Sequence, residues 1–202
     1  MMDLRAVVFD IGNVVLDFDF SPLLRDAARL AGRPAGEIAR VFADPALQRE
    51  FECGLLAPEE FFRKASAAVP LPIGYDGFVR LWNDIFRETP GTAGILRELA
   101  GKRKLLAASN TNALHLDHIR RTFPVLSLFD SVVASCELGV CKPDPALYAE
   151  VSRRAGEPPE RIAFVDDLEA NVEGASRAGM TGILFRGAPA LRRRLVELGI
   201  LS

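Results

Sequence analysis

The sequence predicts an α/β fold built on a parallel sheet, and three observations lead to this prediction. Five short apolar runs, rich in β-branched residues or phenylalanine, recur along the chain, and each is followed by a helix-like stretch. Four of these runs end in a polar residue. The first and second runs are separated by more than 90 residues, far more than a single crossover helix needs. A parallel sheet with a separate insertion accounts for all three.

The composition is that of an ordinary globular protein. The chain has 202 residues, of which 49% are hydrophobic and 26% charged, and this length suits one domain that carries a smaller inserted lobe. A disordered working state is therefore excluded. The formal net charge of -2 provides no electrostatic footprint for nucleic acid or for an anionic membrane. We expect any bound phosphate to be held by a few local groups.

The N-terminal residues and the cysteines predict a cytoplasmic protein with reduced thiols. Asp3 and Arg5 come too early for a secretory signal, and no stretch of about 18 apolar residues could span a bilayer. The three cysteines, Cys53, Cys136 and Cys141, are odd in number and form no CxxC pair, which is typical of free thiols in a reducing compartment.

The five apolar runs are the predicted strands, and their polar ends are the predicted site. The runs cover residues 6–9, 105–108, 132–134, 162–165 and 182–185. Short, continuous apolar segments are expected where both faces of a sheet are covered. The polar residues that follow four of them are Asp10, Ser109, Ser135 and Asp166. Ligands of such sheets bind beyond the carboxyl ends of the strands, so we expect these side chains to converge.

The long segment after the first strand predicts an all-helical lobe at residues 18–88, with the remaining core at 1–17 and 89–202. Within it we expect helices at 22–31, capped by Ser21 and stopped by Gly32, and at 58–69 and 74–87. The lobe contains eight of the thirteen phenylalanines together with Trp82. Most of these aromatic side chains are expected to form its core, and one or two to face a substrate.

Asp10 ends the first strand, and Gly12 follows it at a point where the backbone can turn sharply. A carboxylate at a strand tip can bind a hard cation with one oxygen and attack phosphorus with the other. An equally simple interpretation makes Asp10 the cap of the next helix.

Ser109 and Asn110 end the second strand. Their hydroxyl, amide and backbone N–H groups lie where the next helix starts, which favours anion binding. Ser and Asn are also common helix caps, so the pair alone does not decide between these roles.

Lys142 lies between a predicted tight turn and Pro143, which stiffens its backbone. A lysine in so rigid a setting offers a fixed positive charge to a phosphoryl group and to neighbouring carboxylates.

Asp166 and Asp167 end the fourth strand side by side. Two adjacent carboxylates repel each other unless a cation or a lysine compensates, so the pair indicates a divalent metal. Because all the ligands would be oxygens, the expected ion is Mg²⁺.

In this order the four motifs resemble those of the haloacid dehalogenase superfamily. They are Asp10-x-Gly-Asn-Val, Ser109-Asn110, Lys142-Pro143, and Asp166-Asp167 with Asn171-Val172-x-Gly174-Ala175. The match extends over nearly the whole chain. Residues 12–15, 109–112 and 136–148 look most like the sugar-phosphate phosphatase branch, typified by bacterial α-D-glucose-1-phosphate phosphatases.

The resemblance implies a Rossmann-like core with an inserted helical cap, and a magnesium-dependent phosphatase acting on a small phosphomonoester. It implies that Asp10 attacks phosphorus, while Ser109, Asn110 and Lys142 bind the phosphoryl group. Mg²⁺ would be held by Asp10, by the carbonyl of Gly12 and by Asp167, with Asp166 beside them. A sugar 1-phosphate is the candidate substrate, and neither nucleic acid nor membrane is an expected partner. The oligomeric state is not indicated.

Gly12 departs from the pattern of the family. Most phosphatases of this superfamily have a second aspartate there, which acts as the general acid. Protonation of the leaving oxygen contributes about 10²- to 10⁴-fold in rate, so an anomeric or acyl phosphate would suit this enzyme better than an alkyl phosphate. Asp17 and Asp19 lie nearby but are expected to mark the hinge into the cap.

Two other functions compete with this interpretation. A metal-free 2-haloacid dehalogenase would use Asp10 to displace halide from carbon, but it would not need the acidic pair at 166 and 167. A catalytically silent binding module of the same fold is compatible with Gly12. His115 and His118 stand three apart on a helix and, without a third ligand, are expected to be surface residues.

Overall fold

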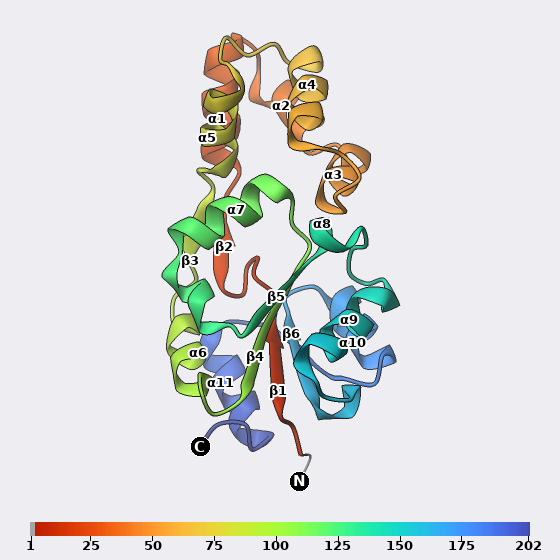
Figure 1. The fold of residues 1–202 in the computed structure, drawn as a ribbon. Helices are drawn as coiled ribbons and strands as arrows, with labels where there is room; N and C mark the ends of the chain where they lie inside the picture. Colours follow the sequence, from red (N-terminus) through yellow and green to blue (C-terminus); the bar gives the residue numbers. More distant parts are fainter. Residues whose placement is uncertain (1–2) are drawn as a thin grey trace.

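The computed structural model describes residues 3–202 and contains a five-stranded parallel sheet in the order β5-β4-β1-β6-β7 (Figure 1). At least one helix lies between each two consecutive strands of this sheet, and the whole helical segment lies between the first two. The strands are β1 (Ala6–Phe9), β4 (Lys104–Ser109), β5 (Ser131–Ala134), β6 (Ile162–Asp166) and β7 (Thr181–Leu184). These strands overlap the five predicted runs.

The central strand β1 is buried on both faces, which explains its continuous apolar sequence. Val8 lies beside Leu106 of β4 and Phe164 of β6 in the parallel register. Alternate side chains point to opposite faces of a strand, so Val7 and Phe9 enter the larger apolar core while Val8 enters the second one. The sheet is therefore the middle layer of three.

Helices cover both faces of the sheet (Figure 1). One layer contains α6 and α11, which contact each other, and the other contains α9 and α10. The bounds are α6 (Thr92–Leu99), α7 (Ala113–Thr122), α8 (Ser135–Leu138), α9 (Pro145–Ala155), α10 (Glu169–Arg177) and α11 (Ala188–Glu197). Two short 3-10 helices, Pro124–Leu128 and Pro159–Arg161, precede β5 and β6.

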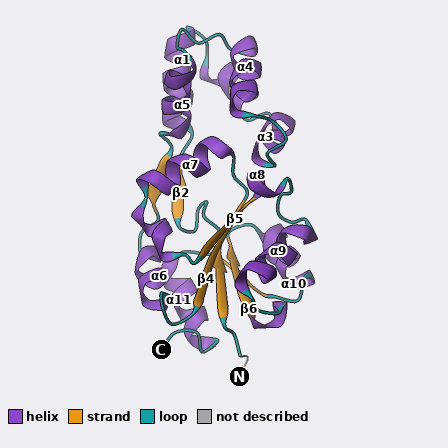
Figure 2. Cartoon of the chain, viewed as in Figure 1, coloured by secondary structure: helices purple, strands orange, loops and turns teal. Residues whose placement is uncertain are grey.

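The segment between the first two strands of the large sheet forms a helical unit beyond the carboxyl ends of the strands (Figure 2). It contains α1 (Ser21–Ala31), α2 (Ala35–Phe42), α3 (Pro45–Glu52), α4 (Pro58–Ala68) and α5 (Tyr75–Asn83). Two short antiparallel strands, β2 (Leu16–Phe18) and β3 (Phe86–Glu88), connect it to the core. The predicted fold class, a Rossmann-like core with an inserted helical cap, is confirmed.

Aromatic side chains fill the centre of this helical unit. Trp82 is fully buried, and Phe78 stacks on it with the ring centroids 5.7 Å apart. Phe51 and Phe61 form a second stacked pair at 4.1 Å. Buried aliphatic side chains such as Leu23, Ile38 and Val69 complete this core, in which each large ring buries the most area.

Two helix predictions in this unit were wrong at their ends. Ser21 is the first residue of α1 rather than its cap, and its N–H donates to Asp19 Oδ1 at 2.8 Å. The helix predicted at 74–87 ends at Asn83 because the chain must extend again to pair β3 with β2. The apolar spacing of residues 78–86 does not distinguish a longer helix from a helix followed by a strand.

Residues 3–202 contain no helix that is long and apolar enough to cross a membrane.

Candidate active site

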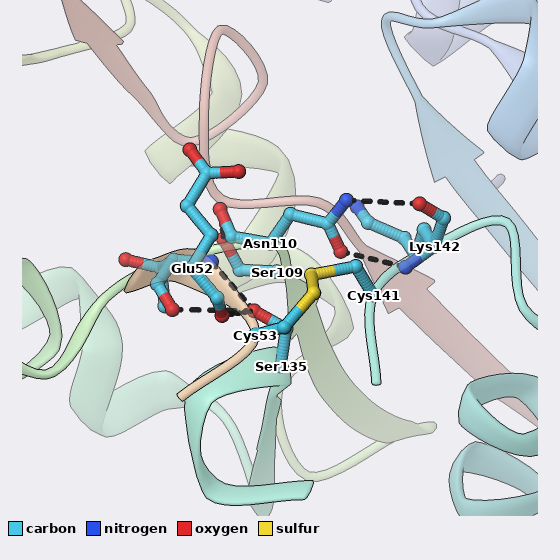
Figure 3. The surroundings of a disulfide bond; sticks show 8 residues. Glu52, Cys53, Ser109, Asn110, Ser135, Cys141 and Lys142 are labelled. Atoms are coloured by element: carbon cyan, nitrogen blue, oxygen red, sulfur yellow. Dashed lines mark hydrogen bonds between the residues drawn. A yellow bond between two sulfur atoms is a disulfide. The ribbon is translucent and has the colours of Figure 1, made fainter. Parts of the chain in front are cut away.

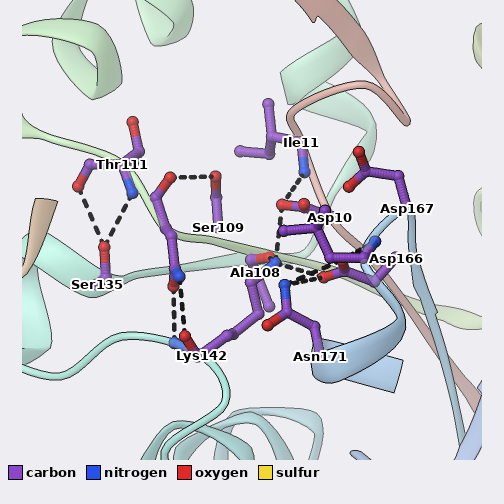
Figure 4. Close-up of polar contacts among 12 residues, drawn as sticks. Asp10, Ile11, Ala108, Ser109, Thr111, Ser135, Lys142, Asp166, Asp167 and Asn171 are labelled. Carbon is purple, nitrogen blue, oxygen red and sulfur yellow. Dashed lines mark hydrogen bonds and ion pairs between the residues drawn. The ribbon is translucent and has the colours of Figure 1, made fainter. Parts of the chain in front are cut away.

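Asp10 leaves the end of β1 and turns its carboxylate into the space above the sheet (Figure 4). Its backbone N–H donates to Val165 O at 2.8 Å, which continues the pairing with β6 for one residue beyond the strand. Its Oδ1 accepts hydrogen bonds from the Ile11 N–H at 2.7 Å and from Lys142 Nζ at 2.9 Å. The carboxylate is therefore fixed in orientation, and only 8% of the residue is exposed.

Lys142 is a buried cation that holds the cluster together. Its Nζ contacts Asp10 Oδ1 at 2.9 Å, Asp166 Oδ2 at 2.7 Å and the carbonyl of Ala108 at 2.9 Å. An ammonium has three N–H groups, and these three acceptors satisfy all of them. These three contacts hold the side chain in place, as the predicted rigid setting of Lys142 requires.

Asn110 braces the loop that carries Lys142. Its Nδ2 donates to the carbonyl of Lys142 at 3.0 Å, and its Oδ1 accepts the N–H of Lys142 at 2.7 Å. Both ends of the amide are therefore engaged with the backbone. The predicted contact of Asn110 with phosphate stays a prediction for its backbone N–H.

The two adjacent carboxylates of Asp166 and Asp167 have different surroundings. Asp166 is fully buried and accepts hydrogen bonds from the Leu168 N–H at 2.9 Å and from Asn171 Nδ2 at 3.0 Å, besides its ion pair with Lys142. Asp167 is half-buried, and its Oδ2 accepts one hydrogen bond, from Asn13 Nδ2 at 3.1 Å. Asp167 is thus the carboxylate with free ligand capacity.

The turn after β1 and the start of α10 shape this edge of the site. Asn13 adopts a left-handed conformation with φ of 54°, which asparagine tolerates better than most residues, and this turns its amide toward Asp167. Gly174 lets α10 approach α9 closely, because a Cβ there would lie 2.5 Å from the hydroxyl of Tyr148. That hydroxyl donates to the carbonyl of Asn171 at 2.8 Å and so helps to place the residue that holds Asp166.

Asp10, Asp166 and Asp167 form the only acidic cluster of metal-binding geometry among residues 3–202. One carboxylate oxygen from each lies within 4.8 Å of the others. A set of hard oxygen donors at one point fits Mg²⁺ better than softer transition metals. The residues present therefore fit the predicted ion.

The charges of this cluster depend strongly on one another. Burial raises the pKa of Asp10 to about 7, and the nearby carboxylates of Asp166 and Asp167 add to this, whereas Lys142 opposes it. Burial alone would lower the pKa of Lys142, but Asp10 and Asp166 together raise it above its usual value. Lys142 therefore stays protonated and offsets part of the negative charge of the acidic cluster.

A short loop, residues 110–112, joins β4 to α7. Ser109 ends β4 and is almost fully buried beside the cluster. The N–H of Thr111 donates to Ser135 Oγ at 2.9 Å, which ties this loop to the end of β5. Asn112 caps α7 through the N–H of His115. All four strand ends therefore meet at one edge of the sheet, as the sequence predicts.

Gly12 faces a phenylalanine where the family has a second aspartate. A Cβ at Gly12 would lie 3.0 Å from Cε1 of the Phe18 ring. The ring thus occupies the space beside the missing side chain. Asp17 accepts a hydrogen bond from the Thr89 hydroxyl and Asp19 accepts one from the Ser21 N–H, and their expected place at the hinge into the cap stays a prediction. The predicted role of the Gly12 carbonyl as a metal ligand stays a prediction.

A cavity of about 410 Å³ opens between the helical cap and the strand ends. Residues 109–111, which follow β4, and residues of the cap share its wall. The lining residues are Ile11, Gly12, Phe18, Phe20, Leu24, Phe42, Ala43, Pro45, Gln48, Glu52, Ile85, Phe86, Ser109, Asn110, Thr111, His115 and Ile119.

Glu52 is a site residue that sequence reasoning missed. It ends α3 in the cap and lines the same cavity as Gly12 and Ser109. Figure 3 shows its side chain beside the residues at the end of β4. Burial raises the pKa of Glu52 to about 7, the negative charge of Asp10 adds to this, and Lys142 acts in the opposite direction. Nothing in the local sequence separates Glu52 from an ordinary surface glutamate, because its position follows from how the cap docks.

The raised pKa of Glu52 predicts a pH-dependent effect of Glu52→Gln on the metal-free protein. In the folded state the carboxyl holds its proton up to about pH 7, whereas its ordinary value is 4.5. The folded state therefore binds more protons between these values, so the glutamate costs stability as pH rises through this window. With a chelator present, Glu52→Gln is expected to raise the free energy of unfolding by up to about 3 kcal/mol at pH near 8, and by little below pH 4.5.

Urea titrations of both proteins at the two pH values measure this difference. An equal shift at both values would contradict the prediction, because a simple packing effect does not titrate.

Cys53 and Cys141 form a disulfide between the cap and the core, which corrects the prediction of three reduced thiols (Figure 3). Their Cα atoms lie 5.6 Å apart although 88 residues separate them in sequence. Only Cys136 is free within residues 3–202. The count of cysteines and the lack of a CxxC pair carry no information on which residues the fold brings together. The cytoplasmic location stays a prediction.

The disulfide lies next to a contact between α3 of the cap and α8 of the core. Cys141 directly precedes Lys142, so this part of the cap lies beside the lysine. Ser135 Oγ donates to the carbonyl of Glu52, and Gly54 packs so closely that a Cβ there would lie 2.2 Å from the carbonyl oxygen of Cys136. Gly54 also has a φ of 68°, which glycine adopts readily. These contacts hold Glu52 over the site.

The long loop closed by the disulfide predicts a large effect of Cys53→Ser. Closing a loop of this length is expected to contribute about 2–5 kcal/mol to the free energy of unfolding. Denaturant titrations of Cys53→Ser should therefore show that loss, and dithiothreitol should produce the same loss in the natural protein. Cys136→Ser is the matched control and should change stability little. Equal stability of oxidised and reduced protein would contradict the expectation.

His115 is a buried wall residue rather than the expected surface residue. Its Nδ1 lies 3.0 Å from Asn112 Nδ2, and its Nε2 lies 3.2 Å from the carbonyl of Trp82. Burial lowers its pKa to about 3, so the ring is neutral. The cap covers this face of α7, which the isolated sequence of the helix does not reveal. His118 is half-exposed, in keeping with the expectation for it.

Two known phosphatases are similar to this chain over most of its length. Phosphatase MT3486 of Mycobacterium tuberculosis is 30% identical over 199 residues, which cover 91% of this chain and 88% of that protein. The phosphorylated carbohydrates phosphatase of Thermotoga maritima is 29% identical over 187 residues, which cover 89% of this chain and 84% of that protein.

A solved structure has the same fold. A haloacid dehalogenase family enzyme from Bacteroides thetaiotaomicron, in complex with magnesium and inorganic phosphate, superposes with a TM-score of 0.81 at 22% identity. The match covers 91% of this chain and 95% of that one. Residues 4–179 match the haloacid dehalogenase-like hydrolase family. With this match, the ordered motifs and the converging strand ends, the chain belongs to the haloacid dehalogenase-like hydrolases.

Proposed function

We propose that this protein is a magnesium-dependent phosphatase that hydrolyses a small phosphomonoester through an aspartyl-phosphate on Asp10. The observation that carries the proposal is the buried cluster in which Lys142 joins Asp10 and Asp166, with Asp167 open beside them. A nucleophilic carboxylate, a fixed cation and a metal-binding acid at one point are the groups that phosphoryl transfer needs.

Mg²⁺ would be held by Asp10, Asp167 and the carbonyl of Gly12, with Asp166 supporting from beside. The buried Asp166 has its oxygens occupied by Lys142, Asn171 and a backbone N–H, so Asp167 suits the direct ligand position better. When bound, the ion neutralises charge on the phosphoryl oxygens and on the carboxylates around it.

The reaction proceeds in two in-line steps. A carboxylate oxygen of Asp10 forms a bond to phosphorus while the bond from phosphorus to the leaving oxygen breaks. Water then forms a bond to phosphorus, the aspartyl-phosphate bond breaks, and the carboxylate and inorganic phosphate are released. The fixed positive charge of Lys142 and the donors around Ser109 stabilise the equatorial oxygens throughout, which lowers the barrier electrostatically.

The helical unit at residues 18–88 acts as the cap of this enzyme, and residues 1–17 with 89–202 act as its catalytic core. Supporting this division, β2 and β3 connect the two parts and the cavity lies between them. The cap supplies the wall around the leaving group and limits the access of water.

The motif resemblance makes a sugar 1-phosphate one candidate substrate. The similarity to the phosphorylated carbohydrates phosphatase of Thermotoga maritima supports a phosphorylated small molecule in general. The absence of an aspartate at position 12 further favours a substrate whose leaving group needs little protonation.

Phosphate release from acetyl phosphate, hexose 1-phosphates, hexose 6-phosphates and nucleotides, with Mg²⁺ and with excess EDTA, tests this function. We expect release that requires Mg²⁺ and is restored when the ion is added back. Chloride release from 2-chloropropionate without metal, and no phosphate release from any ester, would instead identify the dehalogenase. A protein that binds phosphate but turns over neither class would be the silent binding module.

A further inference from the structure

The cavity beside residues 109–111 has an apolar wall. Phe18 and Leu24 line it at the base of the cap, Phe42 lines it from α2 and Phe86 from β3, and Ile119 of α7 lines it from the core side. Phe18 is 39% exposed, so packing leaves part of its ring uncovered, and this residue lines the cavity. Its position beside Gly12 places this apolar surface next to the reacting centre.

Three of the polar side chains in the wall, Asn110, His115 and Gln48, already have hydrogen-bond partners. Asn110 is engaged at both ends with the backbone of Lys142. Both ring nitrogens of His115 have partners, and the amide nitrogen of Gln48 donates to the carbonyl of Phe42. These paired groups offer few free partners to the hydroxyls of a sugar ring, and a buried hydroxyl without a partner is costly.

The charge of the wall also restricts the ligand. Glu52 is the only ionisable carboxyl group that lines the cavity, and none of the described lining residues is a lysine or an arginine. His115 is held neutral by burial, which lowers its pKa to about 3. A leaving group with a further phosphate would therefore find no cation in this wall.

We propose that this cavity binds the leaving group of the substrate and that the leaving group is a hydrocarbon chain. The substrate class is then a monophosphate with one polar end at Asp10 and Lys142 and an apolar body between Phe18, Leu24 and Phe42. This inference rests on the phosphatase function proposed above and narrows its substrate. A volume of about 410 Å³ is within the usual size of small-molecule sites.

A series of acyl phosphates of increasing chain length, from acetyl to octanoyl phosphate, tests the inference. Their leaving groups are carboxylates of nearly equal basicity, so the missing general acid affects all members alike. Burial of each added methylene is expected to raise kcat/KM by about 2- to 4-fold until the cavity is filled. Glucose 1-phosphate is expected to react with a kcat/KM below that of the longer acyl phosphates.

Two matched variants of α1 separate the cavity from general effects. Leu24→Asn changes a wall residue to a polar one of similar size and should flatten the dependence on chain length. Leu30→Asn makes the same exchange on the same helix outside the cavity lining and should leave that dependence unchanged.

The outcomes distinguish this inference from the proposed function. Magnesium-dependent turnover of acetyl phosphate with no gain from longer chains, or a higher kcat/KM for glucose 1-phosphate, would overturn the hydrocarbon leaving group alone. No turnover of any member, acetyl phosphate included, would overturn the phosphatase function and the inference with it.

Discussion

Asp10→Asn is expected to reduce phosphate release by about 10⁴-fold or more, because an amide oxygen is a poor nucleophile and the intermediate cannot form. The side chain is nearly isosteric and keeps an oxygen for the Ile11 N–H, so the fold should persist. Lys142 retains its ion pair with Asp166 in this variant. Steady-state release from acetyl phosphate measures the loss.

Asp76→Asn makes the same exchange at an exposed position in the cap and is the matched control. It should retain full activity. Turnover by Asp10→Asn within about tenfold of the natural enzyme would show that another group attacks phosphorus.

Lys142→Met is expected to lower both activity and stability. Loss of one fixed positive group at the transferring phosphoryl oxygens should reduce kcat by about 10²- to 10³-fold. The same change leaves Asp10 and the fully buried Asp166 without their cation, which is expected to lower the free energy of unfolding of the metal-free protein by about 3–5 kcal/mol.

The double variant Lys142→Met with Asp166→Asn tests the cause of that destabilisation. Removing the unpaired buried charge should recover part of the stability but none of the activity, and urea titrations with a chelator present measure the difference. Lys102→Met, at an exposed position, is the control. A double variant less stable than the single one would contradict the account of Asp166 as a buried, uncompensated charge.

The core of the fold and the strand-end residues could be predicted from the sequence because local patterns determine them. A strand buried on both faces needs a continuous apolar run, and a polar residue directly after it must lie at the edge of the sheet. Asp10, Ser109 and Asp166 follow from this rule. Lys142 was identified by its stiff setting, and its three buried contacts explain why that setting is needed.

The parts that escaped prediction depend on contacts between distant segments. Glu52 enters the site because α3 docks on α8, and the Cys53–Cys141 disulfide arises from the same contact. The burial of His115 requires the cap to cover α7, through contacts that include Trp82. The spacing of apolar residues within one helix does not predict which other helix will cover which of its faces.

The apolar cavity could be foreseen only in part. The sequence predicts that one or two aromatic side chains of the inserted lobe face a substrate, whereas four of its phenylalanines, Phe18, Phe20, Phe42 and Phe86, line the cavity. Which of the eight phenylalanines would do so depends on the packing around Trp82. Phenylalanines form both the core of the cap and the wall of the cavity, so the composition of the segment does not show which of them line the cavity.

The most direct test of the phosphatase mechanism is to trap the covalent intermediate. The enzyme is mixed with ³²P-labelled acetyl phosphate and Mg²⁺, quenched in acid within a turnover, and digested for mass spectrometry of the labelled peptide. We expect an acid-stable, hydroxylamine-sensitive label on Asp10 that is lost in Asp10→Asn and with EDTA. Phosphate release at full rate without label on Asp10, or label on another residue, would contradict the assignment of Asp10 as the nucleophile.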